Sequence, residues 1–361
     1  MTRHPIRCME NICNLSFAEV VSRVRELGEP DFRAKQIWQW IWQKGVTDFA
    51  SMTNIGKGLR SRLSDRFSLQ LPRIHTRRES ADGTCKLLLA LEDGELIETV
   101  LIPERDHFTL CLSTQVGCQL GCTFCSTGQM GFRRNLTAGE ILGQILVARQ
   151  ELARRQHPFP LRNLVYMGMG EPLLNWPEVQ RSLAVIRDPA GLDFSHRRVT
   201  LSTVGIPERL EEFMATGQAS LAISLHASSQ AVREQIMPAA ARLCSIEELV
   251  ARLGRLPLKP RQRITVEYLL IQGVNDSIEQ AVALNRLLSF IPCKINLIAC
   301  NTAPDLGCRP PDQDTVLAFE QVLWSKGKTA TLRKSKGTDI QAACGQLKGT
   351  STKGQTAPEN A

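Results

Sequence analysis

The spacing of hydrophobic residues changes once along the chain, near residue 105. Before that point, apolar positions recur every three to four residues in SFAEVVSRVRELG and FRAKQIWQWIWQKG, which predicts two amphipathic helices that each end at a glycine. Ser16 and Glu19 form a capping box at the start of the first helix. Trp38 and Trp42 share one face of the second helix, where the spacing favours core packing over stacking on nucleic-acid bases.

After residue 105, short β-branched or apolar runs alternate with helical patterns. The expected strands read FTLCLST, LVYMGM, RVTLST, LAISLHA, ITVEYLLI, KINLIA and TATLRK. The expected helices between them read TAGEILGQILVARQELARRQ, PEVQRSLAVIR, IPERLEEFMATG, SIEELVARLGR and DSIEQAVALNRLLSF. Strands that alternate with helices predict an α/β fold with a parallel sheet, here a complete or partial (β/α) barrel whose chemistry lies at the carboxyl ends of the strands.

This pattern divides the chain into four parts. Residues 1–78 are expected to form a small, basic, helical accessory domain, and residues 79–103 a β-rich connection. Residues 104–345 are expected to form the barrel core. Residues 346–361 are expected to be a disordered tail, because KGTSTKGQTAPENA has no apolar periodicity.

Composition places the chain among ordinary globular proteins. With 361 residues, of which 43% are hydrophobic, it can bury a full-sized core. Its longest apolar runs are a few residues, far short of the ~20 needed to span a bilayer, and no secretory signal pattern follows Met1. We therefore expect a cytoplasmic protein that does not contact membranes.

Charge is distributed unevenly along the chain. Residues 1–78 carry a net charge of +7, residues 79–325 carry −4 and residues 326–361 carry +5. Basic ends around an acidic core favour contact with a polyanion such as RNA. The alternative is that these lysines and arginines only form solvated surfaces, which would give the same net charges. The candidates for phosphate contact are Arg60, Arg62, Arg66, Arg73, Arg77 and Arg78.

Three of the twelve cysteines form a compact motif, Cys118-x3-Cys122-x2-Cys125, directly after the expected strand FTLCLST. In a reducing compartment, clustered thiols bind metal or react more often than they form disulfides. Three thiolates can hold a four-iron cluster with one iron left open to a substrate. The alternative is a structural zinc with Cys111 as fourth ligand, but Cys111 lies inside the strand and the chain has no second CxxC pair.

The CxxxCxxC loop, with Phe124 before its last cysteine, resembles that of the radical S-adenosylmethionine enzymes. The resemblance implies a [4Fe-4S] cluster and S-adenosylmethionine, which one electron cleaves to a 5′-deoxyadenosyl radical. It also implies a set of cofactor-binding residues, each at the carboxyl end of an expected strand: Gly170 and Glu171 in MGMGEPLLN, Ser202 in TLSTVG, Ser224, Leu225 and His226 in ISLHA, and Asn301 in INLIACN.

Two further thiols, Cys111 in TLCLSTQVGC and Cys344 in DIQAACGQL, resemble the pair of the RlmN group of ribosomal RNA adenine methyltransferases and the related Cfr enzymes. The match runs from PDFRAKQIWQWIW to the Gly-Gln-Leu at 345–347. It implies that one S-adenosylmethionine methylates Cys344 and that a radical from a second one takes hydrogen from that S-methyl group. The resulting carbon radical adds to adenine, whose carbon 2 cannot attack a sulfonium methyl. Glu98 in ELIETVLIPE is implied as the proton acceptor, and Cys111 as the thiol that releases the product through a transient disulfide with Cys344.

The resemblance implies as substrates an adenine in the peptidyl transferase centre of 23S rRNA and the adenine beside the tRNA anticodon. It further implies an electron donor such as flavodoxin or ferredoxin, and we expect the chain to act as a monomer. Methylation at carbon 8, as in the Cfr group, is the nearest alternative, although the N-terminal helical region favours carbon 2. An alternative of another class is a non-catalytic, metal-binding RNA adaptor.

Overall fold

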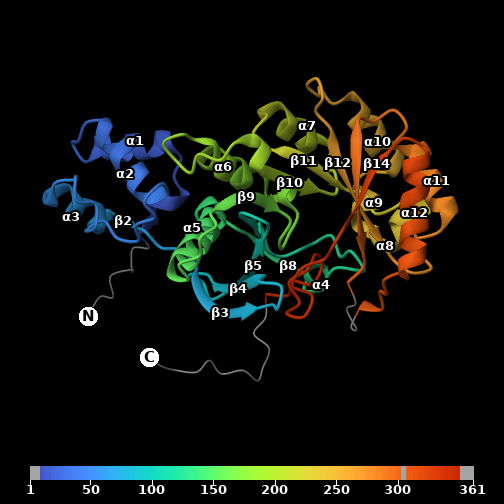
Figure 1. Cartoon of the computed structure of the whole chain (residues 1–361). Helices are drawn as coiled ribbons and strands as arrows, with labels where there is room; N and C mark the ends of the chain where they lie inside the picture. The colour runs from blue at the N-terminus through green and yellow to red at the C-terminus, as the bar shows by residue number, and fades with distance from the viewer. Residues whose placement is uncertain (1–8, 302–305, 350–361) are drawn as a thin grey trace, which may run out of the picture.

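The computed structural model describes residues 9–301 and 306–349 of the chain (Figure 1). Three helices build the N-terminal domain: α1 (Phe17–Glu26), α2 (Phe32–Trp42) and α3 (Lys57–Arg66). The 3₁₀ turn η1 (Ile12–Asn14) and the two-stranded sheet of β1 (Glu10–Asn11) and β2 (Phe67–Ser68) complete it. The capping box at Ser16 is present, and Trp38 and Trp42 are buried in edge-to-face contact, so the predicted helices and their packing are confirmed.

A ten-stranded sheet forms the body of the molecule, in the order β14-β13-β12-β11-β10-β9-β6-β5-β4-β3. Seven strands run parallel: β6 (Phe108–Cys111), β9 (Leu161–Tyr166), β10 (Val199–Thr203), β11 (Ser220–Ser224), β12 (Ile264–Leu270), β13 (Cys293–Ala299) and β14 (Thr329–Arg333). They match the seven strands expected from the sequence. Because β14 and β3 are the two edges and do not pair, the barrel is partial and open.

The other three strands form an antiparallel arm on β6. These are β3 (Arg73–Glu79), β4 (Cys85–Ala90) and β5 (Leu96–Pro103). The strand β3 begins inside residues 1–78, where only helical structure was expected. The alternation of half-buried and exposed residues in RIHTRRE is the period of a strand with one covered face, and this signal was missed.

Five helices after residue 105 agree with the predicted patterns: α5 (Ala138–Arg154), α6 (Trp176–Arg187), α7 (Pro207–Thr216), α10 (Ile246–Arg255) and α11 (Ile278–Leu287). The helices α4 (Ser126–Gln129), α8 (Gln230–Ile236), α9 (Pro238–Leu243) and α12 (Gln313–Ser325) were not predicted, nor were the 3₁₀ turns η2 (Pro172–Asn175) and η3 (His196–Arg198). For α12 the signal was present, because Asp312 caps it and its buried residues Val316, Phe319 and Leu323 recur at helical spacing.

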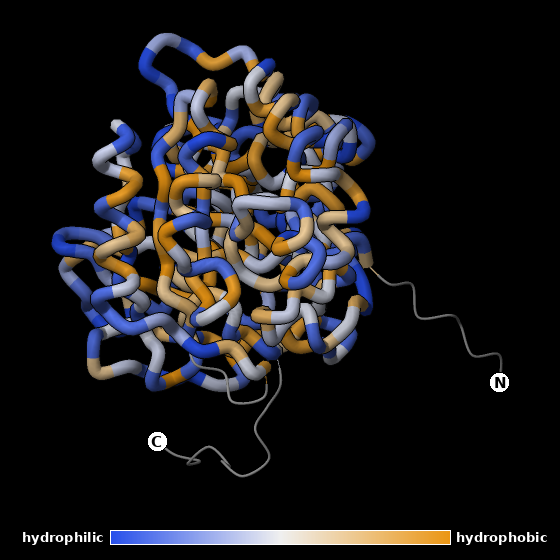
Figure 2. Tube along the Cα trace, turned by 90° about the vertical axis from the view of Figure 1, so that its right-hand side faces the viewer, coloured by the Kyte–Doolittle hydropathy of each residue, from blue (hydrophilic) through white to orange (hydrophobic). Residues whose placement is uncertain are grey.

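The core lies between the sheet and the helices that cover its outer side, and in Figure 2 the hydrophobic segments, in orange, run through the interior. Within residues 9–301 and 306–349, no helix combines the length and the hydropathy needed to cross a bilayer. Residues 346–349, expected to begin a disordered tail, instead pack inward: Leu347 is buried and its carbonyl accepts a hydrogen bond from Thr127 Oγ1 at 2.7 Å. The rest of that expected tail, 350–361, lies outside the described residues.

Candidate active site

The three clustered cysteines lie on a hairpin. Strands β7 (Gln115–Gly117) and β8 (Phe132–Asn135) pair antiparallel, and the loop between them carries the motif and the short helix α4. The Cys118 amide donates to the Gly131 carbonyl at 2.9 Å and closes the loop. Gly117 has φ +77°, and a Cβ there would lie 1.8 Å from the Gly131 oxygen, so the closure requires glycine. The motif therefore follows a second, short strand and not β6 directly.

Cys118, Cys122 and Cys125 line one cavity of about 160 Å³, here called the first cavity. Burial raises the pKa of the Cys118 thiol to about 12 and raises the pKa of Cys122 and Cys125 as well. A bound cation reverses this effect, because metal ligation deprotonates thiols outright. Among the described residues, no group of three His, Cys, Asp or Glu side chains is arranged to hold a single metal ion. The fit to a cluster is therefore carried by the donor set of three thiols that border one cavity.

Five of the seven predicted cofactor-binding residues line this same cavity, namely Gly170, Glu171, Ser202, Ser224 and His226. They follow or end β9, β10 and β11, so the carboxyl ends of neighbouring strands bring them together. The hydroxyl oxygens of Ser202 and Ser224 lie 3.3 Å apart. Of the other two, Leu225 is fully buried, and Asn301 donates from Nδ2 to the Cys344 carbonyl at 3.3 Å.

Glu171 is a buried carboxylate at the wall of the first cavity. It accepts hydrogen bonds from Thr203 Oγ1 at 2.5 Å and from the amides of Leu173 and Val204, each at 3.1 Å. Burial nevertheless dominates and raises its pKa to about 7. The neighbouring Gly170 has φ +94°, and a Cβ there would come within 2.5 Å of the Gln115 side chain. An ammonium group in the cavity would meet this carboxylate and favour its charged form.

His226 presents a neutral imidazole to the first cavity. Its Nδ1 accepts the Leu269 amide at 3.0 Å, so the ring hydrogen of the neutral form is on Nε2. Burial lowers its pKa to about 3. The ring stands edge-on to Phe124 of the cysteine loop, with the ring centroids 5.2 Å apart. The backbone φ of His226 is +54°, which is rare for a residue other than glycine. The geometry thus fixes a hydrogen-bond donor next to the cysteines.

Two further residues of the site were missed from the sequence. Glu267 of β12 lines the first cavity at 4% exposure, and its Oε1 accepts Asn296 Nδ2 at 3.0 Å while its buried Oε2 has no partner among the described residues. An orphaned carboxylate oxygen that borders a cavity fits a ligand with hydroxyl groups, such as a ribose. Arg333 at the end of β14 also lines the cavity. The charged residue in the apolar run ITVEYLLI was the available signal for Glu267.

Cys111 and Cys344, 233 residues apart, both line a second cavity of about 270 Å³. Cys344 also lines the first cavity, whereas Cys111 does not. Burial raises the pKa of Cys111 to about 12, while Cys344 is exposed on a turn. That turn is held against the cysteine loop, because the Ser126 amide donates to the Gly345 carbonyl at 2.7 Å. Both thiols are free in the described structure.

Glu98 lies outside both cavities. Its side chain is 6% exposed, and Oε1 forms an ion pair with Lys86 Nζ at 3.0 Å. Its Oε2 accepts the Lys348 amide at 2.8 Å, and Lys86 Nζ also donates to the Gln341 carbonyl at 2.9 Å. The Lys86–Glu98 pair therefore ties β4 and β5 to the chain on both sides of Cys344.

Several of the arginines proposed for phosphate contact already have partners. Arg62 pairs with Glu29, Arg66 pairs with Glu26, and Arg77 pairs with Glu151 at 3.1 Å. The charge of the N-terminal region is thus partly neutralised by its own carboxylates. The second cavity carries a different basic surface, formed by Arg333, Lys334 and Lys336 with a single carboxylate, Glu104.

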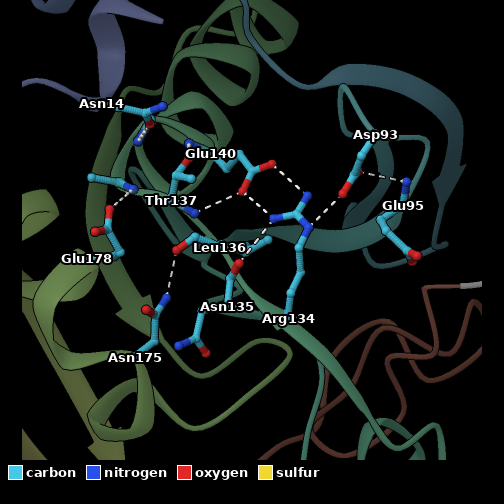
Figure 3. A network of polar contacts seen from close by, with 12 residues as sticks. Asn14, Asp93, Glu95, Arg134, Asn135, Leu136, Thr137, Glu140, Asn175 and Glu178 are labelled. Atoms are coloured by element: carbon cyan, nitrogen blue, oxygen red, sulfur yellow. Dashed lines mark hydrogen bonds and ion pairs between the residues drawn. The ribbon is translucent and has the colours of Figure 1, made fainter. Parts of the chain in front are cut away.

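A polar network at the base of the cysteine hairpin joins it to its surroundings (Figure 3). Arg134 of β8 pairs with Asp93 of the β4–β5 turn at 2.7 Å and with Glu140 of α5 at 2.8 Å. Asn14 of the N-terminal domain accepts the Gly139 amide, also of α5, at 2.9 Å. Through α5, the hairpin, the antiparallel arm and the N-terminal domain are held in one arrangement.

Comparison with known proteins adds the family. Residues 10–69 match the model of the ribosomal RNA large subunit methyltransferase N-terminal domain, and residues 112–284 match that of the radical SAM superfamily. The chain is 55% identical over 340 residues to the dual-specificity RNA methyltransferase RlmN of Solidesulfovibrio magneticus, covering 94% of this chain and 97% of that protein. It is 55% identical over 348 residues to that of Nitratidesulfovibrio vulgaris, covering 94% of each.

A crystal structure of a radical SAM methyltransferase from Sphaerobacter thermophilus superposes with a TM-score of 0.89 at 38% identity. The superposition covers 94% of this chain and 100% of that one. The similarity therefore extends over the N-terminal domain, the antiparallel arm and the open barrel together.

Proposed function

Because the chain belongs to the RlmN family of radical S-adenosylmethionine RNA methyltransferases, we propose that it methylates carbon 2 of a specific adenine in 23S rRNA and of the adenine beside the tRNA anticodon. One observation supports this reading above the others. Cys344 borders both the cavity of the three clustered thiols and the cavity of Cys111. A methyl group on Cys344 would stand where the two halves of the reaction meet.

In this proposal, Cys118, Cys122 and Cys125 would hold a [4Fe-4S] cluster, and S-adenosylmethionine would bind beside it on the residues of the first cavity. When bound, these groups supply the carbon radical that removes hydrogen from the S-methyl group of Cys344. The protein's own part is to bind these groups and orient them toward Cys344. Glu171 and the Gly170 turn receive the amino group of the cofactor, and the remaining contacts come from Ser202, Ser224, Leu225, His226 and Asn301.

Cys344 acts first as a nucleophile. Its thiolate displaces the methyl group from the sulfonium of S-adenosylmethionine, which leaves as the neutral thioether. Arg333 lines both cavities beside this thiol and places a positive charge next to it. Its exposure on a turn gives Cys344 access to both cavities, which a cysteine inside a strand would not have.

Cys111 acts last. Once the methylene carbon has bonded to the adenine ring and the radical adduct has given its unpaired electron to the oxidised electron carrier and its ring proton to a base, the Cys111 thiolate attacks the Cys344 sulfur. An S–S bond then forms and the S–C bond breaks. The electron pair of that bond goes to the methylated base, which takes up a proton, and cellular thiols reduce the disulfide. Glu98 is proposed as the acceptor of the ring proton. For this role its carboxylate must release the Lys348 amide and turn toward the second cavity.

The target adenine must leave its stack to reach the thiols. The cations of the second cavity, Arg333, Lys334 and Lys336, offer contacts for the phosphates that flank it, and the N-terminal domain supplies further contact with the RNA. Flavodoxin or ferredoxin is the proposed electron donor, and the chain is proposed to act as a monomer. No observation favours the two alternatives, methylation at carbon 8 of adenine and a non-catalytic role as an RNA adaptor.

The test uses the protein reconstituted under exclusion of air, with S-adenosylmethionine, a reductant and a 23S rRNA fragment. Digestion and mass spectrometry should find 2-methyladenosine; 8-methyladenosine, or no methylated base, would contradict the proposal. Cys344→Ala should abolish transfer. Cys293→Ala on β13 is the matched control, because Cys293 lines neither cavity, and it should retain activity.

A further inference from the structure

Arg233 of α8 is a buried cation without a carboxylate partner. It has 0% exposure, and among the described residues no Asp or Glu oxygen lies within 4.0 Å of its guanidinium. Its Nη1 donates to the Leu225 carbonyl at 2.9 Å and weakly to that of Ser224 at 3.4 Å, and its Nη2 donates to the Val204 carbonyl at 2.8 Å. Its Nε has no partner there. A buried arginine without a counter-charge is costly, so an anion is expected nearby.

The helix of Arg233 lies directly against the cysteine loop. Thr123, which stands between two of the clustered cysteines, donates from its amide to the Ile236 carbonyl at 3.0 Å, and its hydroxyl reaches the same oxygen at 3.4 Å. Ile236 is one turn after Arg233 on α8. The guanidinium interacts electrostatically with the Cys122 sulfur and with that of Cys244. The positive charge of α8 therefore acts on Cys122, one of the three thiols of the first cavity, behind the contact between Thr123 and Ile236.

The charge of the proposed cluster makes this placement consequential. A four-iron core of charge +2 with three thiolates carries −1, and reduction by one electron makes it −2. A fixed positive charge favours the more negative form, and in a site sheltered from solvent the interaction is weakly screened. The neutral His226 and the hydroxyls of Ser202 and Ser224 carry no charge, and Glu171 on the same cavity opposes that of Arg233. Arg333 lines the cavity as a second cation and stays in place in every Arg233 variant, so the variants report the contribution of Arg233 alone.

We propose that Arg233 is a positioning residue for the iron–sulfur site, whose buried charge stabilises the reduced cluster and raises its reduction potential. Its hydrogen bonds also hold the loops after β10 and β11 against the cofactor. The inference rests on the proposed function, since it needs a cluster on Cys118, Cys122 and Cys125. A role in packing alone predicts a different result, because the three carbonyls need donors and do not need a charge.

Three variants separate charge from hydrogen bonding. Arg233→Lys keeps the charge and loses the planar fork, Arg233→Gln keeps donors without charge, and Arg233→Met keeps length alone. The exposed Arg242 on the neighbouring helix α9 provides the matched control, Arg242→Gln. Each reconstituted protein is titrated with dithionite and mediators, and the reduced cluster is followed by electron paramagnetic resonance. Affinity for S-adenosylmethionine is measured in parallel.

We expect Arg233→Gln and Arg233→Met to lower the equilibrium constant for one-electron reduction at least tenfold, which is about 59 mV more negative. Arg233→Lys should keep most of the parent potential, and Arg242→Gln all of it. A parent-like potential in Arg233→Gln, or an equal loss in Arg233→Lys, would overturn the electrostatic role. Failure of the parent protein to form any cluster would instead overturn the proposed function.

A second measurement covers the case in which the Arg233 variants do not fold. Cys244→Asp places a carboxylate beside the guanidinium and leaves its three hydrogen bonds in place. The added negative charge should lower the potential in the same direction as Arg233→Gln. A reduction potential that is unchanged in Cys244→Asp would count against the proposal as strongly as an unchanged potential in Arg233→Gln.

Discussion

Removal of the Lys86 charge should destabilise the protein and loosen the turn of Cys344. Both partners of the Lys86–Glu98 pair are 6% exposed, and their charged atoms lie 3.0 Å apart. Deleting one partner of such a pair leaves a buried, uncompensated charge, at a cost of about 3–5 kcal/mol. Lys86→Met also removes the donor to the Gln341 carbonyl at 2.9 Å, which adds about 1 kcal/mol. The expected loss is therefore roughly 4–6 kcal/mol, a large share of the stability of a domain.

The assay is urea unfolding of the cluster-free protein, followed by far-ultraviolet circular dichroism. Lys86→Met/Glu98→Leu should recover part of the loss, because no buried charge remains without a partner, and the cycle gives the coupling energy. The surface pair of Arg209 and Glu212, at 2.7 Å, is the control, and Arg209→Met should cost less than about 1 kcal/mol. The reasoning would be refuted if Lys86→Met lost as little free energy of unfolding as the Arg209→Met control. It would also be refuted if the double variant lost more than the two single variants added together.

The remaining predictions concern the first cavity and the two thiols. Burial raises the folded-state pKa of Glu171 to about 7, so between the unfolded pKa and pH 7 the folded state binds one proton more than the unfolded state. The cluster-free protein should therefore lose up to roughly 3 kcal/mol of stability as pH rises through that window. Thermal unfolding of Glu171→Gln should show a flatter dependence on pH. Gly117→Ala should prevent iron loading, as measured by iron per chain, because its Cβ would strike a carbonyl 1.8 Å away, whereas Gly121→Ala, with open space and φ +57°, should load far more. Cys111→Ala should accumulate a covalent protein–RNA adduct on denaturing gels while Cys344→Ala forms none; an adduct without Cys344 would contradict the covalent route.

Periodicity was enough to predict the seven parallel strands of the sheet. The seven parallel strands, β6 and β9 to β14, contain the short β-branched or apolar runs that predicted them, and β6, β10 and β12 are buried along nearly their whole length. The number and order of these strands fixed where the carboxyl ends would meet. The five expected cofactor-binding residues that gather on the first cavity lie at the carboxyl ends of such strands or a few residues after them. The helix α8 could not be predicted in this way, because seven residues are too few to show a helical repeat of hydrophobic positions. The tertiary packing of Thr123 against its last turn places it, and with it Arg233.

Residues whose role depends on a distant partner could not be read in the same way. Glu98 sits in the apolar strand LIETVLIP, and nothing nearby in the sequence indicates that Lys86 lies across the ladder or that the Lys348 amide, 250 residues later, caps its second oxygen. Local patterns encode faces and turns, whereas an ion pair across strands is set by register. The break in period at β3 had a local signal, but the basic residues in RIHTRRE suggested a nucleic-acid surface and concealed the strand.

The antiparallel arm, most of which was expected as a β-rich connection that carries the proton acceptor, holds the chain on both sides of Cys344. Lys86 on β4 and Glu98 on β5 grip the chain at Gln341 and Lys348, and Cys344 lies between these two points. A turn held at both ends can present its thiol to the first cavity and to Cys111 in the second without a large rearrangement of the barrel. The same carboxylate cannot hold the Lys348 amide and accept a proton from a substrate ring in one geometry. In the proposed mechanism, proton transfer to Glu98 would therefore be coupled to release of the segment after Cys344, and through it to the proposed attack of Cys111 on the Cys344 sulfur.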